Sequence, residues 1–469
     1  MKNSFNGNGL QRQIGLFSAT VLVIANMVGT GIFTTSGFIM GELGDGRLLL
    51  LCWLYGGLFA LCGALCYGEL GARFPRAGGE YVFLKESFGK PVGFLSGWIS
   101  LIVGFSAPIA AASIAFATYC FQAFSIPTTT MAVLSLFETP IVTLSSLNLA
   151  AIGVISLFTL VHYHSLRTGS RVQNLLTLFK VALVLTFIAA GLGAGHGSFH
   201  HFQTSAGLSS SLSAENFAVA LIFVSFAYSG WNAAAYLGSE IIDPRRNIPY
   251  ALFIGTAVVT LLYLLLNVVY LYAVPPREMA GVMEIGAQAA VYLFGEQVSR
   301  LFSGAVALGI LSVLSAMIMT GPRIYYAMSK DGIFFRLFGK LSSAHKTPAY
   351  SIFLQAAIAV LMVVSASFEA LLIYIGFTLS LFALLTVIGL MRIRLQRSTD
   401  GRSYKTLGYP ITPLLFIVGN IYIVLFSLKS RPVTGLIGLG TIGLGIIAYI
   451  LFDRVHRSKT NPDLTEDML

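Results

Sequence analysis

The feature that most constrains this chain is a series of long apolar stretches, most of them without a charged residue. A helix needs about 20 such residues to cross the roughly 30 Å of hydrocarbon in a bilayer. The first stretch, residues 13–41, is too long for the apolar region of a signal peptide, and similar stretches follow it. Charged residues make up only 10% of the 469 residues, against about a quarter in soluble domains. The sequence therefore predicts a polytopic membrane protein with one membrane domain.

Twelve membrane helices are predicted from these stretches. They lie near residues 14–40, 48–72, 91–121, 147–165, 173–194, 215–241, 249–273, 298–322, 349–366, 370–391, 411–428 and 434–452. All but six of the 29 lysine and arginine residues then fall on the side of the N-terminus. The positive-inside rule predicts a multi-pass protein of the cell membrane with both the N- and C-termini in the cytoplasm. Because this topology explains the net charge of +10, we expect no nucleic-acid partner.

Two of the predicted spans are interrupted at a similar depth. The first contains the sequence Val-Gly-Thr-Gly at 28–31, and the sixth contains Tyr-Ser-Gly-Trp-Asn at 228–232. A glycine in one span is equally well explained by close helix packing, but two interruptions five spans apart indicate an inverted repeat. We therefore expect one repeat at 14–194 (spans 1–5), a second at 215–391 (spans 6–10), and two further spans at 411–452. Unwound backbone at this depth must be buried in protein or line a cavity.

The unpaired backbone groups at such breaks can bind both ends of a zwitterion. The positive end of a half-helix suits a carboxylate, and here its N–H groups would belong to Gly29, Thr30 and Gly31. Free carbonyl oxygens suit an ammonium group, and those of the sixth span would belong to Phe226, Ala227 and Ser229. Together they describe a site for the backbone of an α-amino acid. Since no Asp or Glu lies in the middle of a predicted span, a cationic or polyamine substrate is disfavoured.

Five motifs, in order along the chain, carry a resemblance to a known family. They are Gly-Thr-Gly-Ile-Phe at 29–33, Phe-Pro-Arg-Ala-Gly-Gly-Glu-Tyr at 74–81, residues 226–232, Glu240 with Asp-Pro-Arg-Arg-Asn-Ile-Pro at 243–249, and residues 323–332. With these motifs the chain resembles the amino acid–polyamine–organocation (APC) superfamily of transporters, and within it the L-type neutral amino acid transporters and their bacterial relatives. The resemblance implies an all-α membrane protein with the leucine-transporter fold: 12 transmembrane helices, a 5+5 inverted repeat, and broken helices 1 and 6.

The resemblance also implies roles for individual residues. It places the substrate carboxylate at the glycine turn of the first span, and the amino group at carbonyls of the sixth span and of Met27. It implies an aromatic gate, which here would consist of Phe226, Trp231 and Tyr263. For Tyr263, a hydroxyl bonded to a neighbouring helix is an equally good interpretation. We expect an amino acid substrate, lipid around the spans, and neither a cofactor nor a metal.

The positions of the cysteines bear on whether a partner subunit is attached by a disulfide. Eukaryotic L-type transporters attach to a glycoprotein through a cysteine between the third and fourth spans. The corresponding segment here, residues 124–146, contains no cysteine, and the four cysteines all fall in predicted spans. We therefore expect no disulfide-linked auxiliary subunit.

Lys180 is the one basic residue that lies deep inside a predicted span. It lies about 13 Å along the helix from Arg171, and it shares a stripe with Gln173 and Thr177, so it is expected to face the bundle interior. A charge at this depth is functional by default. In sodium-independent members of the family a lysine here replaces a sodium ion that bridges the first and eighth spans. Ser312 and Ser315 of the eighth span could accept hydrogen bonds from it, or could bond to their own helix.

These observations predict a transporter and not an enzyme. The expected function is sodium-independent transport of neutral L-amino acids by alternating access, as a facilitator or exchanger. The alternative is a proton-coupled amino acid symporter in which Lys180 is the titrating group.

Overall fold

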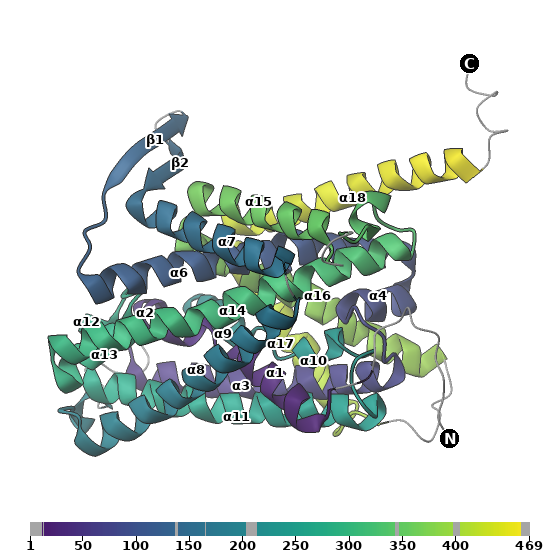
Figure 1. Ribbon diagram of the computed structural model, residues 1–469. Helices are drawn as coiled ribbons and strands as arrows, with labels where there is room; N and C mark the ends of the chain where they lie inside the picture. The colour runs from purple at the N-terminus through teal and green to yellow at the C-terminus, as the bar shows by residue number, and fades with distance from the viewer. Residues whose placement is uncertain are drawn as a thin grey trace.

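The computed structural model describes residues 12, 14–136, 139–164, 166–202, 213–342, 347–396 and 404–460. Almost all of these residues are helical, and most of the long helices run side by side along one direction (Figure 1). The two chain ends, which the charge pattern places in the cytoplasm, lie outside the described residues. The predicted all-helical membrane architecture is confirmed in its main features.

Each predicted span coincides with one helix or with consecutive helical segments. Those in the first half of the chain are α1 (Leu16–Met27) with α2 (Thr30–Leu43), α3 (Gly46–Arg73), α5 (Lys90–Ile99) continued by the π-helix η1 (Ser100–Ser106) and α6 (Ala107–Phe124), α7 (Ser146–His164) and α8 (Leu166–Ala194). Those in the second half are α9 (Ala214–Tyr228) with α10 (Ala233–Tyr236), α11 (Pro244–Ala273), α14 (Glu296–Lys330), α15 (Ala349–Ser365), α16 (Phe368–Gln396), α17 (Ile411–Ser430) and α18 (Pro432–Thr460).

Short helices fill the connections. They are α4 (Glu80–Phe88), α12 (Pro276–Met279), α13 (Ile285–Phe294) and the 3₁₀ turns η2 (Phe199–Phe202) and η3 (Arg336–Gly339). Within the described residues, nine helices are long and apolar enough to cross a membrane, and the bent pair α1–α2 makes ten. The predicted spans at α9 and α15 correspond to shorter helices of 15 and 17 residues. The total of twelve spans therefore stays a prediction.

Both predicted breaks are present. Helices α1 and α2 meet at a bend of 41°, with Val28 and Gly29 between them. In the sixth span α9 ends at Tyr228, and α10 begins only after residues 229–232. Gly230 has φ of +93°, a conformation that residues with a side chain rarely adopt. Gly31, in contrast, lies inside α2 and not in the unwound turn, so the first break is shorter than expected.

The helices differ in how deeply they are enclosed. In the segment from α5 through α6, 78% of the most apolar window is buried, whereas in α18 only 22% is buried. Helix α11 packs along α3 and α1, and α14 packs along α6 and α8. The segments around the two breaks therefore lie within a shell of other helices, and α18 belongs to the lipid-facing periphery.

A β-hairpin interrupts the helical pattern between α6 and α7. Its strands β1 (Thr130–Leu136) and β2 (Thr139–Ser145) pair antiparallel, and the hairpin projects from the end of the bundle (Figure 1). The described chain is nearly all-helical, as predicted, and this two-stranded hairpin is an addition to that fold. Threonine and valine are frequent in both strands, and such β-branched residues favour extended backbone.

Candidate functional site

The two breaks lie directly against each other. A Cβ atom placed on Gly31 would be only 2.4 Å from the Cα of Ala227 at the end of α9, and one placed on Gly230 would be 2.8 Å from the carbonyl oxygen of Asn26. Because these neighbours are backbone atoms, a side chain at either glycine would push the two half-helices apart. Glycine at both positions therefore allows the close approach of the first and sixth spans.

The last carbonyl groups of α1 receive hydrogen bonds from side chains of other helices. A helix that ends in the membrane leaves these oxygens without intrahelical partners. The ammonium group of Lys180 donates to the carbonyl oxygen of Ala25 over 2.9 Å. The hydroxyl of Tyr263 on α11 lies 2.5 Å from the carbonyl oxygen of Met27 and 3.1 Å from that of Ala227. One tyrosine thus bridges both breaks, and a cation sits at the negative end of α1.

Lys180 is fully buried, as its helical stripe predicted. Its side-chain carbons pass over Gly309 of α14, where an added Cβ would lie 3.4 Å from the lysine Cγ. The lysine therefore contacts the first and eighth spans together. Its proposed serine partners bond elsewhere in this conformation. Ser312 donates to the carbonyl oxygen of Gly309 over 2.8 Å, and Ser315 lies 2.9 Å from Nε2 of His162 on α7.

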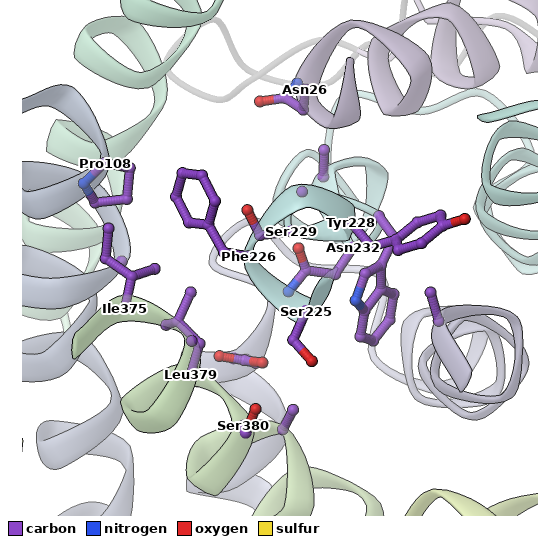
Figure 2. A pocket seen from close by; sticks show the side chains of 18 of the residues that line it. Asn26, Pro108, Ser225, Phe226, Tyr228, Ser229, Asn232, Ile375, Leu379 and Ser380 are labelled. Carbon is purple, nitrogen blue, oxygen red and sulfur yellow. The ribbon is translucent and has the colours of Figure 1, made fainter. Parts of the chain in front are cut away.

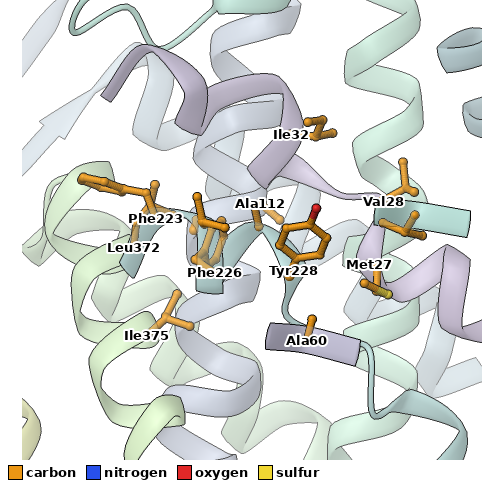
Figure 3. Close-up of a cluster of buried hydrophobic side chains, with 14 of the residues drawn as sticks. Met27, Val28, Ile32, Ala60, Ala112, Phe223, Phe226, Tyr228, Leu372 and Ile375 are labelled. Atoms are coloured by element: carbon orange, nitrogen blue, oxygen red, sulfur yellow. The ribbon is translucent and has the colours of Figure 1, made fainter. Parts of the chain in front are cut away.

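A cavity of about 130 Å³ lies beside the broken sixth span (Figure 2). A single water needs roughly 10–15 Å³ by the same kind of measure, so this cavity can hold a small solute. Among the predicted site residues, Phe226, Ser229 and Trp231 line it. Phe226 lies between Pro108 and the break (Figure 2). It also belongs with Ile375, another lining residue, to a buried apolar cluster (Figure 3).

The other predicted site residues lie beside this cavity and not on its surface. Within the described part of the chain, the lining does not include Gly29, Thr30, Gly31, Met27, Ala227 or Tyr263. At the junction of the two breaks, Gly31 faces Ala227, the Tyr263 hydroxyl bonds Met27 and Ala227, and Gly29 faces Val313 of α14.

Several polar residues that line the cavity were not among the predicted site residues, and three of them carry an amide or a carboxyl group on a helix. They are Asn26 on α1, Asn420 on α17 and Glu80 at the start of α4. For the two asparagines the signal was available, since an amide within an apolar span needs a reason to be there. Glu80 gave no such signal because it lies outside every predicted span.

Comparison with known proteins identifies the chain's relatives. The family model for amino acid permeases matches residues 14–447. The large neutral amino acids transporter small subunit 2 of Rattus norvegicus is 31% identical over 98% of this chain and 85% of its own length, and its Homo sapiens counterpart is 31% identical over 95% and 81%. The b(0,+)-type amino acid transporter 1 of Mus musculus is 30% identical over 94% of this chain and 88% of its own.

The chain belongs to the amino acid permease family. It is a multi-pass membrane transporter of amino acids and not an enzyme. The family and the broken helices agree with the resemblance found in the five sequence motifs.

Ion pairs tie the permease together on the side of its basic loops. The guanidinium of Arg394 on α16 forms a salt bridge with Glu69 on α3, with Nε 2.7 Å from Oε1. The backbone N–H of Thr406 also donates to Glu69 over 2.7 Å. A second pair joins Lys85 on α4 to Asp331, the residue after α14, at 2.6 Å. Partial burial raises the pKa of Asp331, but the hydrogen bonds from Lys85 and Tyr81 outweigh it and hold that pKa below its usual value.

Proposed function

We propose that this permease carries neutral L-amino acids without sodium, by exchange or facilitated diffusion. The relatives named above include transporters of large neutral amino acids. The cavity supports a neutral substrate as well, because Glu80 is the one acidic residue among its described lining and its carboxyl group already has a partner in Tyr67.

The substrate backbone binds at the junction of the two breaks in this proposal. Its carboxylate is held by N–H groups of residues 29–31, because α2 begins there without a side-chain cap. Its amino group is held by carbonyl oxygens of Met27, Phe226, Ala227 and Ser229. The hydroxyl of Tyr263 occupies two of these oxygens, so we expect the amino group to share or replace its hydrogen bonds. Phe226, Trp231 and Tyr263 are the gate residues, and the substrate side chain extends into the cavity that Phe226 and Trp231 line.

The observation that carries sodium independence is the contact of Lys180 with the end of α1. The buried Lys180 ammonium already donates a hydrogen bond to the carbonyl oxygen of Ala25, and the side-chain carbons of the lysine reach α14 at Gly309. A second cation within a few ångströms would be repelled in this low-dielectric site. In this proposal Lys180 takes the place of a sodium ion between the first and eighth spans, and Ser312 and Ser315 would complete the site in another conformation of the transport cycle.

Alternating access follows from the two repeats, residues 14–194 and 215–391, which would move relative to each other while 411–452 remain outside them. Positive charges on the connecting segments support termini in the cytoplasm. We further propose that transport needs no disulfide-linked partner, since the four cysteines lie in α3 and α6. The relatives from Rattus norvegicus and Homo sapiens, in contrast, are named as small subunits.

The purified permease in proteoliposomes tests this function. We expect labelled leucine to enter vesicles loaded with unlabelled leucine, without a proton gradient and without a second protein. The alternative, a proton-coupled symporter with Lys180 as titrating group, would instead accumulate substrate when an inward proton gradient is imposed and would acidify the lumen. Absence of neutral amino acid uptake under every condition would contradict the proposal.

A further inference from the structure

Glu80 combines burial, a cavity and an unusual set of neighbours. It is the first residue of α4 and follows Gly78 and Gly79, which have φ of +122° and +52°. A Cβ on Gly79 would lie 2.5 Å from the ring of Tyr236, so the glycine lets α4 begin directly against α10. The Glu80 side chain is 7% exposed and borders the cavity beneath the broken sixth span.

The neighbours of this carboxyl group connect it to the break. The hydroxyl of Tyr67 on α3 donates to Oε1 of Glu80. The Tyr67 ring packs edge-on against Trp231 at a centroid distance of 4.6 Å, and Trp231 directly follows Gly230. A change at Glu80 is therefore two contacts away from the turn at which we place the substrate amino group.

The nearby cations pair with other carboxylates. Lys85 lies 2.6 Å from Asp331, Arg76 lies 3.7 Å from Glu86, and Arg394 binds Glu69, while Arg392 lies over the ring of Phe88. The titratable groups that face Glu80 are Tyr67 from α3 and Tyr236 from α10. Among the described residues, no lysine or arginine forms a salt bridge with it.

Such an environment favours the neutral form of a carboxylic acid. A buried carboxylate without a cation costs free energy, whereas the protonated form can both donate and accept hydrogen bonds. Burial raises the pKa of Glu80 to about 7, and the Tyr67 hydroxyl opposes only part of that effect. The group can therefore change its charge near neutral pH.

We propose that Glu80 is a proton-binding site at the edge of the substrate cavity and that it releases its proton when the cavity opens to water on the side of the basic loops. Opening hydrates the carboxylate, so the proton passes from the carboxyl oxygen to water; closing removes that water, and the carboxylate takes a proton back. The proton thus acts on the conformational step. This proposal rests on the proposed transport function for its activity assay.

The activity assay measures leucine exchange at equal pH inside and outside the vesicles. For a pKa of about 7, the deprotonated fraction rises roughly tenfold between pH 6 and pH 8. We expect wild-type exchange to rise by about three- to tenfold over this range. Glu80→Gln keeps the shape and an acceptor for Tyr67 but cannot titrate, so its exchange should be independent of pH. The control is Glu86→Gln. Glu86 lies on the same helix as Glu80 and pairs with Arg76, so the pH profile of this variant should follow that of the wild type.

Infrared difference spectra give a readout that does not depend on transport. In the wild type, a carboxylic-acid carbonyl band should appear as the pH falls from 8 to 6, and it should be missing from Glu80→Gln. Tyr67→Phe, which removes the hydrogen bond to the carboxylate, should move the midpoint to higher pH. If the band and the pH profile persist in Glu80→Gln, this inference is wrong while neutral amino acid exchange stands. If neither variant nor wild type exchanges leucine, the proposed function fails instead.

Discussion

Single residues decide how closely the two broken spans approach each other. Gly31 touches the backbone of Ala227, and we expect Gly31→Ala to reduce leucine exchange by roughly 5- to 150-fold, since overpacking of this kind costs about 1–3 kcal/mol. Gly153→Ala is the matched control, because a Cβ there meets no atom within 4 Å on α7. Exchange near the wild-type rate in Gly31→Ala would show that the contact tolerates a methyl group.

The buried carboxyl group of Glu80 should also make the stability of the folded permease depend on pH. Its pKa is about 7 in the folded permease and about 4.5 when exposed, so the folded state binds the extra proton in between. The stabilisation of the folded state by this extra proton is fully present below about pH 4.5 and is lost as the pH rises to about 7. The free energy of unfolding changes by on the order of 3 kcal/mol over this range. The melting temperature of the wild type relative to Glu80→Gln should therefore fall between pH 5 and pH 7. A constant difference would contradict the burial argument.

Some properties of single residues could be predicted from the sequence and others could not. The burial of Lys180 followed from its position on an otherwise apolar helix, because a charge there must face protein. Its partner, the carbonyl oxygen of Ala25, did not follow, since any backbone oxygen left free at the break would look the same in the sequence. Glu80 was missed because its place in the cavity depends on where α4 packs.

A buried ion pair joins two helices, α3 and α16. The side chains of Glu69 and Arg394 are only 3% and 13% exposed. Glu69→Ala leaves the guanidinium without its partner, and we expect a loss of about 3–5 kcal/mol in stability, measured by thermal unfolding in detergent. The control is Glu296→Ala, whose pair with Arg300 spans 3.7 Å on the surface, where about 0–1 kcal/mol is expected. Equal effects of both variants would contradict this prediction.

Elements with a strong local signal were predicted well. The helices of the spans followed from length and hydropathy, and both breaks followed from the glycine and polar residues within them. The hairpin β1–β2 and the short helices α12 and α13 were not predicted, because they lie in connections where no membrane imposes a length or a period.

On the scale of the whole molecule, the charge asymmetry predicts the orientation. Thr128, before the hairpin, and Lys340, after η3, are both exposed and lie on opposite sides of the predicted membrane. Single cysteines at these positions should differ in their labelling in intact cells. An impermeant maleimide should label Thr128→Cys in intact cells, and it should label Lys340→Cys only after lysis. The reverse labelling pattern would show that the termini are outside.

In the proposed transport function, the fixed positive charge of Lys180 replaces a sodium ion. The most direct measurement is labelled leucine exchange in proteoliposomes with sodium chloride or with choline chloride, for the wild type, Lys180→Ala and the control Lys429→Ala, whose lysine side chain is 68% exposed. We expect equal exchange in both salts for the wild type and the control. Exchange by Lys180→Ala should fall at least about tenfold, because the carbonyl at the end of α1 then lacks its cation. Sodium-stimulated exchange by the wild type, or undiminished exchange by Lys180→Ala, would contradict this role of the lysine.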